Sequence, residues 1–372
     1  MKVIVGLSGG VDSSVAAYLL LQQGHEVEGM FMRNWDSVAN NDVLGNPDLE
    51  NPVCAQETDF LDAQSVANKL GIVLHRVDFV EEYWNDVFQY FLKEHEKGRT
   101  PNPDILCNKY IKFAAFIEEA KKLGAEKVAM GHYARIRETK GTYEMLRGLD
   151  TDKDQTYFLS QLNHEQLSFS LFPIGELTKK EVRAIAKEQG FVTADKKDST
   201  GICFIGERHY KQFLGNYFKP NPGPIVSDQG DVLGEHSGLM KFTIGQRRGM
   251  QIGGTKEHGV EPWFVVGKDT TTNTLILGQG ENHPLLFGNR ATVSDINWLG
   301  EKKDQSITAK FRYRQQDIQC DIHFDHEILH VSMHEPVRAV TPGQAAVFYD
   351  GEVCLGGGFI DEVYMNDERR IY

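Results

Sequence analysis

The sequence begins with a short apolar run that stops at a glycine-rich loop, and this junction constrains the fold more than any other feature. Val3 to Leu7 is a compact run rich in β-branched residues, which predicts a first strand. Ser8-Gly9-Gly10-Val11-Asp12-Ser13 follows it, and a helical pattern then runs through Gln23 to a stop at Gly24. A strand that turns through glycines directly into a helix is typical of α/β proteins with a parallel sheet.

The alternation of strand and helix continues to about residue 205. Further strands are predicted at Glu26–Met32, Ile72–Asp78 and Lys127–Met130, and helices near residues 55–70, 81–97 and 108–123. Thr178 and Glu181 have capping-box spacing, so a helix is expected from there to Gly190, packed on the sheet. The expected fold class is therefore α/β, with a doubly wound parallel sheet whose ligands bind at the carboxyl ends of the strands.

The pattern changes after about residue 206, where short strands and turn residues take over. A central β-rich domain and a C-terminal antiparallel β-barrel are expected, giving domains at residues 1–206, 207–285 and 286–372. Tyr349-Asp350-Gly351-Glu352 is a hairpin signal within the barrel. The expected strands of these two domains are Trp263–Val266, Leu275–Leu277, Ala309–Tyr313, Ile318–Phe324, Ile328–Met333, Ala345–Tyr349 and Glu352–Leu355.

Composition places the chain among soluble globular proteins. Of its 372 residues 40% are hydrophobic and 25% charged, and no uninterrupted apolar run is long enough for a transmembrane helix. The N-terminal apolar run ends in glycines without a cleavage site, so a cytoplasmic protein without a membrane partner is expected. Its five cysteines are odd in number, widely spaced and without a C-x-x-C pair, which argues against a disulfide framework, a zinc site or an iron–sulfur cluster.

The charge is uneven along the chain. The formal net charge is −13, and residues 1–60 carry two basic and nine acidic side chains, a local charge of 2 − 9 = −7. Residues 236–256 hold four basic side chains and no acid, and Lys310-Phe311-Arg312-Tyr313-Arg314 interleaves cations with aromatic rings. Because a nucleic-acid partner responds to the local patch, the overall negative charge does not exclude RNA.

The loop Ser8–Ser13 has the properties of an anion-binding turn. Its glycines let the backbone approach an anion, the helix start supplies free N–H groups, and the serines add hydroxyl donors. No Gly-Lys-Ser/Thr follows, so the loop suits a pyrophosphate leaving group better than transfer of a γ-phosphoryl group. Asp12 is a candidate ligand for a Mg²⁺ ion on those phosphates. The alternative is a tight strand–helix turn that binds nothing.

Two cysteines stand in settings that favour reactivity. Cys107 follows Asn102-Pro103-Asp104, where prolines are expected to hold the chain out of regular structure and place the thiol beside a helix N-terminus, near Lys109 and Lys112. Cys203 lies between Gly201 and Gly206, which suits a mobile sulfur carrier. Cys54 lacks such surroundings, and Cys320 and Cys354 are expected to be buried in strands. Asn102 and Asp104 could instead serve only in a turn.

Several motifs together resemble one family closely. The loop alone resembles the PP-loop of N-type ATP pyrophosphatases, which split ATP between its α- and β-phosphates and adenylate a substrate oxygen. Taken over nearly the whole chain, the sequence resembles the bacterial tRNA-specific 2-thiouridylases. The motifs that carry this resemblance are the loop, Asn102-Pro103-Asp104 with Cys107, Gly131-His132-Tyr133-Ala134-Arg135, Lys153-Asp154-Gln155-Thr156-Tyr157, Gly201-Ile202-Cys203-Phe204-Ile205, Gly245-Gln246-Arg247-Arg248-Gly249 and Arg312-Tyr313-Arg314-Gln315.

The resemblance implies a role for each matching residue. ATP would be bound by Gly6, Leu7, Ser8, Gly9, Gly10, Val11, Asp12 and Ser13, together with Met32 and Gly131. Asn102, Pro103 and Asp104 would contact the target base, the wobble uridine, with Asp104 also a candidate for proton transfer. Contacts with tRNA would come from His132, Lys153, Asp154, Gln155, Arg312, Tyr313 and Gln344. His132, Met32 and Arg312 each have a plain structural alternative, in the core or on a solvated strand.

The expected reaction is an ATP-dependent 2-thiolation of tRNA, with Mg²⁺ as the metal. Cys107 would act as nucleophile and Cys203 as persulfide carrier, by way of a Cys107–Cys203 disulfide or a released sulfide. The resemblance implies tRNAs for lysine, glutamate and glutamine as substrates, and a cysteine desulfurase or sulfur-relay protein as donor. Two alternatives remain: a PP-loop ligase or synthetase that uses no thiols, and an RNA-binding protein without catalysis.

Overall fold

The computed structural model describes residues 1–36, 40, 55–198, 210–250, 252 and 261–372. The chain divides into two compact units, and each is described by itself. The first unit comprises Met1–Gln89, Pro103–His209 and Asp350–Gly356, and the second comprises Tyr90–Asn102, Tyr210–Tyr349 and Gly357–Tyr372. Among the helices in the described ranges, none is long and apolar enough to cross a membrane.

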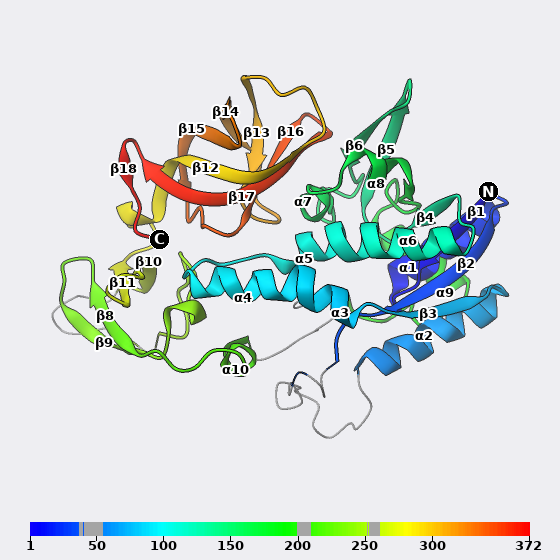
Figure 1. Cartoon of the computed structure of the whole chain (residues 1–372), viewed down its shortest axis with the longest axis horizontal. Coiled ribbons are helices and arrows are strands. Elements are labelled where there is room, and N and C mark those ends of the chain that lie inside the picture. Colours follow the sequence, from blue (N-terminus) through cyan, green and yellow to red (C-terminus); the bar gives the residue numbers. More distant parts are fainter. Residues whose placement is uncertain (37–39, 41–54, 199–209, 251, 253–260) are drawn as a thin grey trace. The chain divides into compact units, whose positions relative to one another are not determined.

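A five-stranded parallel sheet forms the centre of the first unit (Figure 1). Its order is β3-β2-β1-β4-β7, with β1 at Lys2–Gly6, β2 at Glu26–Arg33, β3 at Leu74–Asp78, β4 at Lys127–Ala129 and β7 at Ser170–Leu171. The chain leaves β1 for β2 and β3 on one side and returns to β4 on the other, so the order reverses beside β1. In such sheets the crevice at the carboxyl ends next to this reversal is the preferred ligand site.

Helices cover the sheet because its strands are apolar on both faces. Val3, Ile4 and Val5 are all fully buried. Side chains of α1 (Val11–Gln22) and α2 (Ala55–Leu70) pack on β1 and β2, while α1 also packs against α9 (Lys179–Glu188). The other helical segments of the unit are α3 (Val80–Tyr83), η2 (Trp84–Phe88), α5 (Pro103–Leu106), η3 (Cys107–Ala115), α6 (Phe116–Lys122), α7 (Thr156–Leu159) and α8 (His164–Ser168).

An antiparallel hairpin that the sequence patterns do not predict is added to this unit. Its strands are β5 (Ala134–Thr139) and β6 (Thr142–Arg147), and β6 also pairs with Val353 and Cys354. Lys140 and Gly141 both have positive φ angles, which gives the tight turn the twist of the flanking strands. The outer part of the hairpin is exposed and polar, so it lacks the apolar alternation on which strand prediction depends.

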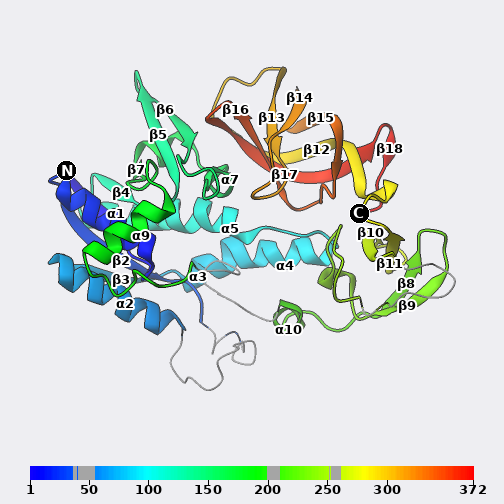
Figure 2. The same cartoon turned by 180° about the vertical axis from the view of Figure 1, so that it is seen from behind.

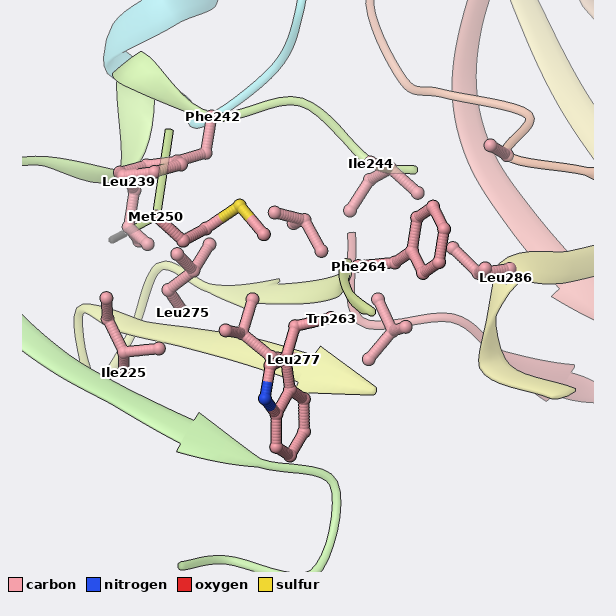
Figure 3. Close-up of a cluster of buried hydrophobic side chains, with 13 residues drawn as sticks. Ile225, Leu239, Phe242, Ile244, Met250, Trp263, Phe264, Leu275, Leu277 and Leu286 are labelled. Carbon is pink, nitrogen blue, oxygen red and sulfur yellow. The ribbon is translucent and has the colours of Figure 1, made fainter. Parts of the chain in front are cut away.

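The second unit contains a four-stranded sheet with its own core. The strand order is β10-β11-β8-β9, with β8 at Gly223–Ser227, β9 at Val232–His236, β10 at Trp263–Asp269 and β11 at Thr274–Gln279. Figure 3 shows the apolar cluster that forms this core, in which Trp263 from β10 lies beside Leu277 from β11. Residues outside the strands, such as Met250 and Leu286, complete the cluster. The helical segments of this unit are α4 (Gln89–Glu96, from Tyr90 on), α10 (Tyr210–Gly215), η4 (Leu239–Lys241) and η5 (Pro284–Leu286).

The C-terminal strands close into an antiparallel barrel, which Figure 2 shows from behind. The order is β12-β15-β14-β13-β16-β17, and a further β12–β17 pairing closes it. The strands are β12 (Phe287–Trp298), β13 (Gln305–Lys310), β14 (Ile318–Asp325), β15 (Ile328–Arg338), β16 (Ala345–Asp350) and β17 (Val353–Met365), with β18 (Glu368–Arg369) paired to β17. The predicted fold class is thus confirmed, and so is the burial of Cys320 and Cys354.

One expected barrel strand is placed wrongly by the sequence. Residues 309–313 were predicted as a strand, but β13 ends at Lys310 and Arg314 has a φ of 64°. The alternation of basic and aromatic residues imitates a strand there, whereas the chain turns away from the sheet. The basic segment Lys310–Arg314 therefore begins at the last residue of β13 and continues beyond the strand.

Candidate active site

The loop between β1 and α1 is held by hydrogen bonds among its own residues. The Ser8 backbone N–H donates to the Ser13 hydroxyl at 3.2 Å, and the Ser13 and Ser14 hydroxyls donate to the Gly10 carbonyl at 3.1 and 2.8 Å. Gly10 is the N-cap residue of α1, and within the described part of the chain no side chain makes a capping hydrogen bond there. The first N–H groups of the helix are therefore available to an anion.

Two glycines let backbone segments approach each other closely around this loop. Gly9 has a φ of +73°, and a Cβ there would stand 2.1 Å from the Asp59 carbonyl oxygen. Gly131, just after β4, is so close to α1 that a Cβ would stand 2.8 Å from the Ser13 nitrogen. Neither position can accept a larger residue without moving the loop. The sheet thereby brings Gly131 to the loop, as the prediction for ATP binding requires.

Met32 and Gly6 lie together at the carboxyl ends of their strands. A Cβ on Gly6 would stand 2.5 Å from the Met130 sulfur and 3.7 Å from the Met32 methyl carbon. Met32 is buried, in keeping with its structural alternative, yet it lies beside the strand end that feeds the loop. The residues predicted to bind ATP thus form one cluster at the reversal point of the sheet.

Lys196 stabilises the Ser8–Ser13 loop through contacts from a distant segment of the chain. Its Nζ donates to the Gly9 carbonyl at 2.8 Å and to Asp59 Oδ1 at 2.7 Å, and it also pairs with Asp62. Burial lowers the pKa of Lys196, but the two carboxylates outweigh it and the pKa is raised. Thr193, three residues earlier, shares a 3.1 Å hydrogen bond with the Ser14 hydroxyl. Sequence reasoning missed this contribution, since the partners are far apart along the chain.

Asp12 lies in the first turn of α1, and its carboxylate is already paired. Lys179 Nζ is 2.8 Å from both carboxylate oxygens, and the Tyr133 hydroxyl donates to Oδ1 at 2.9 Å. Burial, and then the charge of Asp12, raise the pKa of Tyr133. The helix that begins at Lys179 was expected only to pack on the sheet. That expectation is incomplete, because the first residue of α9 reaches into the loop.

Asp198 gathers three cations next to this pair. Its carboxylate is 2.7 Å from Lys153, 2.7 Å from Lys179 and 3.1 Å from Arg183. Burial alone would raise the pKa of Asp198, but the hydrogen bonds from Lys153 and Lys179 prevail and lower it to about 2. No group of three or more metal-ligating side chains occurs within the described residues, so a metal here would need ligands from a substrate as well.

The segment around Cys107 corrects one prediction. Pro103 does not hold the chain out of regular structure; it starts a helix at α5, where a missing N–H costs nothing. Asp104 therefore lies in the first turn, and Cys107 begins η3 one turn further on, fully buried. A thiol at this depth receives less of the helix dipole than one at the N-terminus.

The side chains around Cys107 are engaged in packing and hydrogen bonds. Lys109 Nζ donates to the Gln161 amide oxygen at 3.0 Å and lies over the Tyr110 ring. The Asn108 amide donates to the Phe158 carbonyl at 3.0 Å. Cys107 is not in a disulfide with either Cys320 or Cys354. Cys203 and Cys54 lie outside the described residues.

Four of the residues predicted to contact tRNA lie in the first unit. Two of them, His132 and Asp154, are buried. His132 is buried against Phe113 and Phe172, and desolvation followed by the charge of Lys112 lowers its pKa well below the usual value. Asp154 is buried and accepts hydrogen bonds from the Gly148 and Thr156 backbone N–H groups.

The remaining two of these residues are tied to other elements. The Gln155 side-chain oxygen accepts from the Tyr133 N–H at 3.0 Å, and the Gln155 backbone N–H donates to the Tyr133 carbonyl at 2.9 Å. Lys153 is paired with Asp198. The motif Lys153–Gln155 thus contacts Tyr133, which bonds Asp12, and Asp198, which pairs with Lys179. Its RNA contact remains a prediction.

The residues of the second unit predicted to contact tRNA have structural bonds as well. The Arg312 guanidinium donates to the Ile244 carbonyl at 3.0 Å and to the Thr341 hydroxyl at 2.8 Å. The Gln344 amide donates to the Thr100 carbonyl at 2.6 Å. Arg314 lies over the ring of Tyr313. The exposed cations of the stretch before residue 251 are Arg247 and Arg248.

The parallel sheet with a glycine-lined loop after its first strand defines the class of protein as a doubly wound α/β protein with a candidate anion site at that loop. Residues 1–207 match a family described as "tRNA methyl transferase HUP domain". Residues 211–279 match its PRC-barrel domain, and residues 289–360 match an aminomethyltransferase β-barrel domain.

Full-length relatives are more specific than these domain descriptions. The chain is 55% identical to "tRNA-specific 2-thiouridylase MnmA" of Acholeplasma laidlawii, over 100% of this chain and 99% of the relative. It is 57% identical to the protein of that name in Mesoplasma florum (97% and 99% covered) and 56% to that of Shewanella halifaxensis (97% and 96%). The chain therefore belongs to the family of tRNA-specific 2-thiouridylases, which are tRNA sulfurtransferases. The resemblance predicted from the motifs is confirmed.

Proposed function

We propose that this chain uses ATP to replace the 2-oxygen of the wobble uridine of tRNA by sulfur. The observation that carries the proposal is the glycine-lined loop at the uncapped start of α1, in a chain whose full-length relatives are named 2-thiouridylases. The loop supplies N–H and hydroxyl donors for a pyrophosphate, and Gly131 and Met32 border it at the neighbouring strand ends.

The uncapped start of α1 supports ATP binding at this loop, because a polyphosphate can accept hydrogen bonds from the first N–H groups of the helix. We propose Gly6–Ser13, Met32 and Gly131 as its binding residues. Asp12 would hold a Mg²⁺ ion together with the phosphates, and that ion would neutralise charge on the departing pyrophosphate. A single protein carboxylate is enough for such a site, although Asp12 must first give up Lys179.

The first half of the reaction is an adenylation. The uridine 2-oxygen attacks the α-phosphorus of ATP, the bond to the bridging oxygen breaks, and pyrophosphate leaves. Asn102, Pro103 and Asp104 would hold the base, with Asp104 placed in the first turn of α5 to accept or return a proton. The 2-oxygen then departs easily, because it leaves as part of AMP.

The second half transfers sulfur. The terminal sulfur of a persulfide on Cys203 attacks carbon 2, and AMP leaves with the original oxygen. The Cys107 thiolate then attacks the Cys203 sulfur, the S–S bond to the base breaks, and a Cys107–Cys203 disulfide remains for an external thiol to reduce. Alternatively, Cys107 cleaves the persulfide first and releases a sulfide that attacks the base. Since Cys107 is buried, either route requires a movement that uncovers it.

The family assignment supports a proposal for the substrates and partners. We propose tRNAs for lysine, glutamate and glutamine as substrates, contacted by His132, Lys153, Asp154, Gln155, Arg312, Tyr313 and Gln344. A cysteine desulfurase or a sulfur-relay protein would supply the persulfide. We propose domains at residues 1–206, 207–285 and 286–372, and a cytoplasmic location.

Cysteine variants test the sulfur steps. Cys203→Ser and Cys107→Ser should form no 2-thiouridine, yet both should still release pyrophosphate when tRNA and ATP are supplied together. Cys320→Ala is the matched control, because burial raises the pKa of that thiol to about 12 and makes it unreactive. A Cys203→Ser enzyme that still forms 2-thiouridine would overturn the role proposed for Cys203.

A further inference from the structure

A chain of ion pairs in the first unit joins the nucleotide loop to a residue proposed to contact tRNA. Asp12 pairs with Lys179 at 2.8 Å, Lys179 with Asp198 at 2.7 Å, and Asp198 with Lys153 at 2.7 Å. Acid and base alternate along these four residues. Because each ion pair shares a partner with the next, a change of charge at one end alters the attraction at the other.

Lys179 is the member of this chain of ion pairs that contacts two carboxylates. Its side chain is only 12% exposed, so water screens its charges weakly, and it contacts Asp12 and Asp198 at the same time. Its position is fixed by the capping box at the start of α9, where the Thr178 and Glu181 side chains bond each other's backbone N–H groups. Lys179 can therefore shift its contact between the two carboxylates without a movement of the helix.

Asp198 also pairs with two other cations, and these determine how strongly it attracts Lys179. Lys153 and Arg183 share its carboxylate with Lys179, and together they weaken the hold of Asp198 on Lys179. When an RNA phosphate draws Lys153 away, the negative charge of Asp198 is shared among fewer cations. Lys179 is then attracted more strongly to Asp198 and less strongly to Asp12.

We propose that Asp198 is a positioning residue that couples tRNA binding at Lys153 to Mg²⁺–ATP binding at Asp12. The inference rests on the proposed function, since it takes the tRNA contact of Lys153 and the metal contact of Asp12 from it. Without tRNA, Lys179 neutralises Asp12 and competes with the metal ion. With tRNA bound, Asp12 is released for the metal, so the nucleotide is held firmly only when the acceptor is present.

The coupling is measured as the effect of tRNA on nucleotide affinity. The full chain is titrated with Mg²⁺ and α,β-methylene-ATP, which cannot be cleaved between those phosphates, with and without saturating tRNA. In the wild-type protein, tRNA should lower the Kd of the analogue by about fivefold or more, the lower end of common coupling factors. The reciprocal measurement, with the analogue saturating, should tighten tRNA by the same factor.

Variants of Asp198 isolate its role. Asp198→Asn leaves Lys179 with Asp12 alone, so the analogue should bind more weakly without tRNA and the tRNA effect should fall below about twofold. Asp198→Glu keeps the charge and should restore most of the coupling. Asp195→Asn is the matched control: Asp195 pairs with Lys187 on the surface, and its removal should leave the coupling unchanged.

Each result either supports or overturns the proposed coupling. A wild-type protein without coupling, or an Asp198→Asn variant that keeps it, overturns the inference. If Asp198→Asn does not fold, Lys153→Gln is measured at saturating tRNA and must lose the coupling in the same way. Formation of 2-thiouridine by the wild-type enzyme is scored separately, so failure of the coupling is distinguishable from failure of the proposed function.

Discussion

At the scale of single residues, the Ser8–Ser13 loop depends on positions where a side chain has no room. Gly131 approaches the backbone of α1, and Gly9 approaches Asp59 with a positive φ. The loop itself could be predicted because its glycines, serines and helix start are contiguous in the sequence. Lys179 and Lys196 also contact the loop. They lie 167 and 187 residues from their partners along the chain, so no local sequence pattern predicts these contacts.

Gly131→Ala tests the close approach directly. The new methyl group would meet the Ser13 nitrogen at 2.8 Å, so the start of α1 must move and the ATP site is distorted. We expect the KM for ATP to rise at least about tenfold, which corresponds to roughly 1.4 kcal/mol of lost binding. Steady-state kinetics at saturating tRNA measure it. Gly215→Ala, where a Cβ meets nothing within 4 Å, is the control, and equal behaviour of the two variants would refute the tight contact.

At the scale of elements, strands and helices with clear periodicity could be predicted to within a few residues. The hairpin β5–β6 could not, since it is largely polar and turns through Lys140-Gly141 instead of a common Asn-Gly pair. The helix starting at Pro103 was also missed, because proline both ends and begins helices and only the tertiary setting decides. Cys107 is therefore one turn inside a helix.

Thr178→Ala tests whether the start of α9 serves the site. Loss of the N-cap hydroxyl should lower the free energy of unfolding by about 1 kcal/mol and loosen Lys179 at the first helical position. We expect the affinity for Mg²⁺–ATP to change by more than the loss of stability alone would cause. Asn163→Ala removes the capping box of α8 and should cost similar stability, as urea unfolding shows, while leaving nucleotide affinity intact. Identical nucleotide affinity in both variants would contradict the role of α9.

The strand β10 carries a buried amine that should make stability depend on pH. Lys268 is 2% exposed, donates to the Gly98 carbonyl at 2.7 Å, and burial lowers its pKa to about 7. Between about pH 7 and its ordinary value of 10.5, the unfolded chain binds a proton that the folded chain does not. Stability should therefore rise with pH through this window.

The Lys268→Met variant removes that titration. Urea unfolding followed by tryptophan fluorescence should show a gain in free energy of unfolding from about pH 7 to about pH 9 in the wild-type protein, and a smaller gain in the variant. Equal pH slopes would show that the Lys268 amine keeps its charge in the fold.

At the scale of the whole molecule, the chain is acidic, but two local stretches of it are basic and are candidates for RNA contact. Arg247 and Arg248 are exposed, whereas Arg312 and Gln344 are engaged in bonds within the second unit. The sequence could identify these residues by resemblance, but it could not separate surface cations from cations that hold the fold. That distinction depends on contacts between segments far apart in the chain.

Salt dependence tests both kinds of cation, and stability distinguishes them. Arg247→Ala should weaken tRNA binding and reduce the slope of log K against log salt by about one, since one phosphate contact is lost. Arg312→Ala should also weaken tRNA binding and flatten its salt dependence, and it should lose stability from its two broken hydrogen bonds. Lys302→Ala, an exposed cation outside both basic stretches, is the control. Unchanged slopes in both arginine variants would place the tRNA elsewhere.

The most direct test of the central claim is mass analysis of tRNA nucleosides after incubation with the enzyme, ATP, Mg²⁺ and a persulfide source. The account predicts 2-thiouridine at the wobble position, formed only when ATP is present and accompanied by AMP and pyrophosphate in equal amounts. Sulfur incorporation that does not require ATP, or ATP cleavage with tRNA that leaves every uridine unchanged, would contradict it.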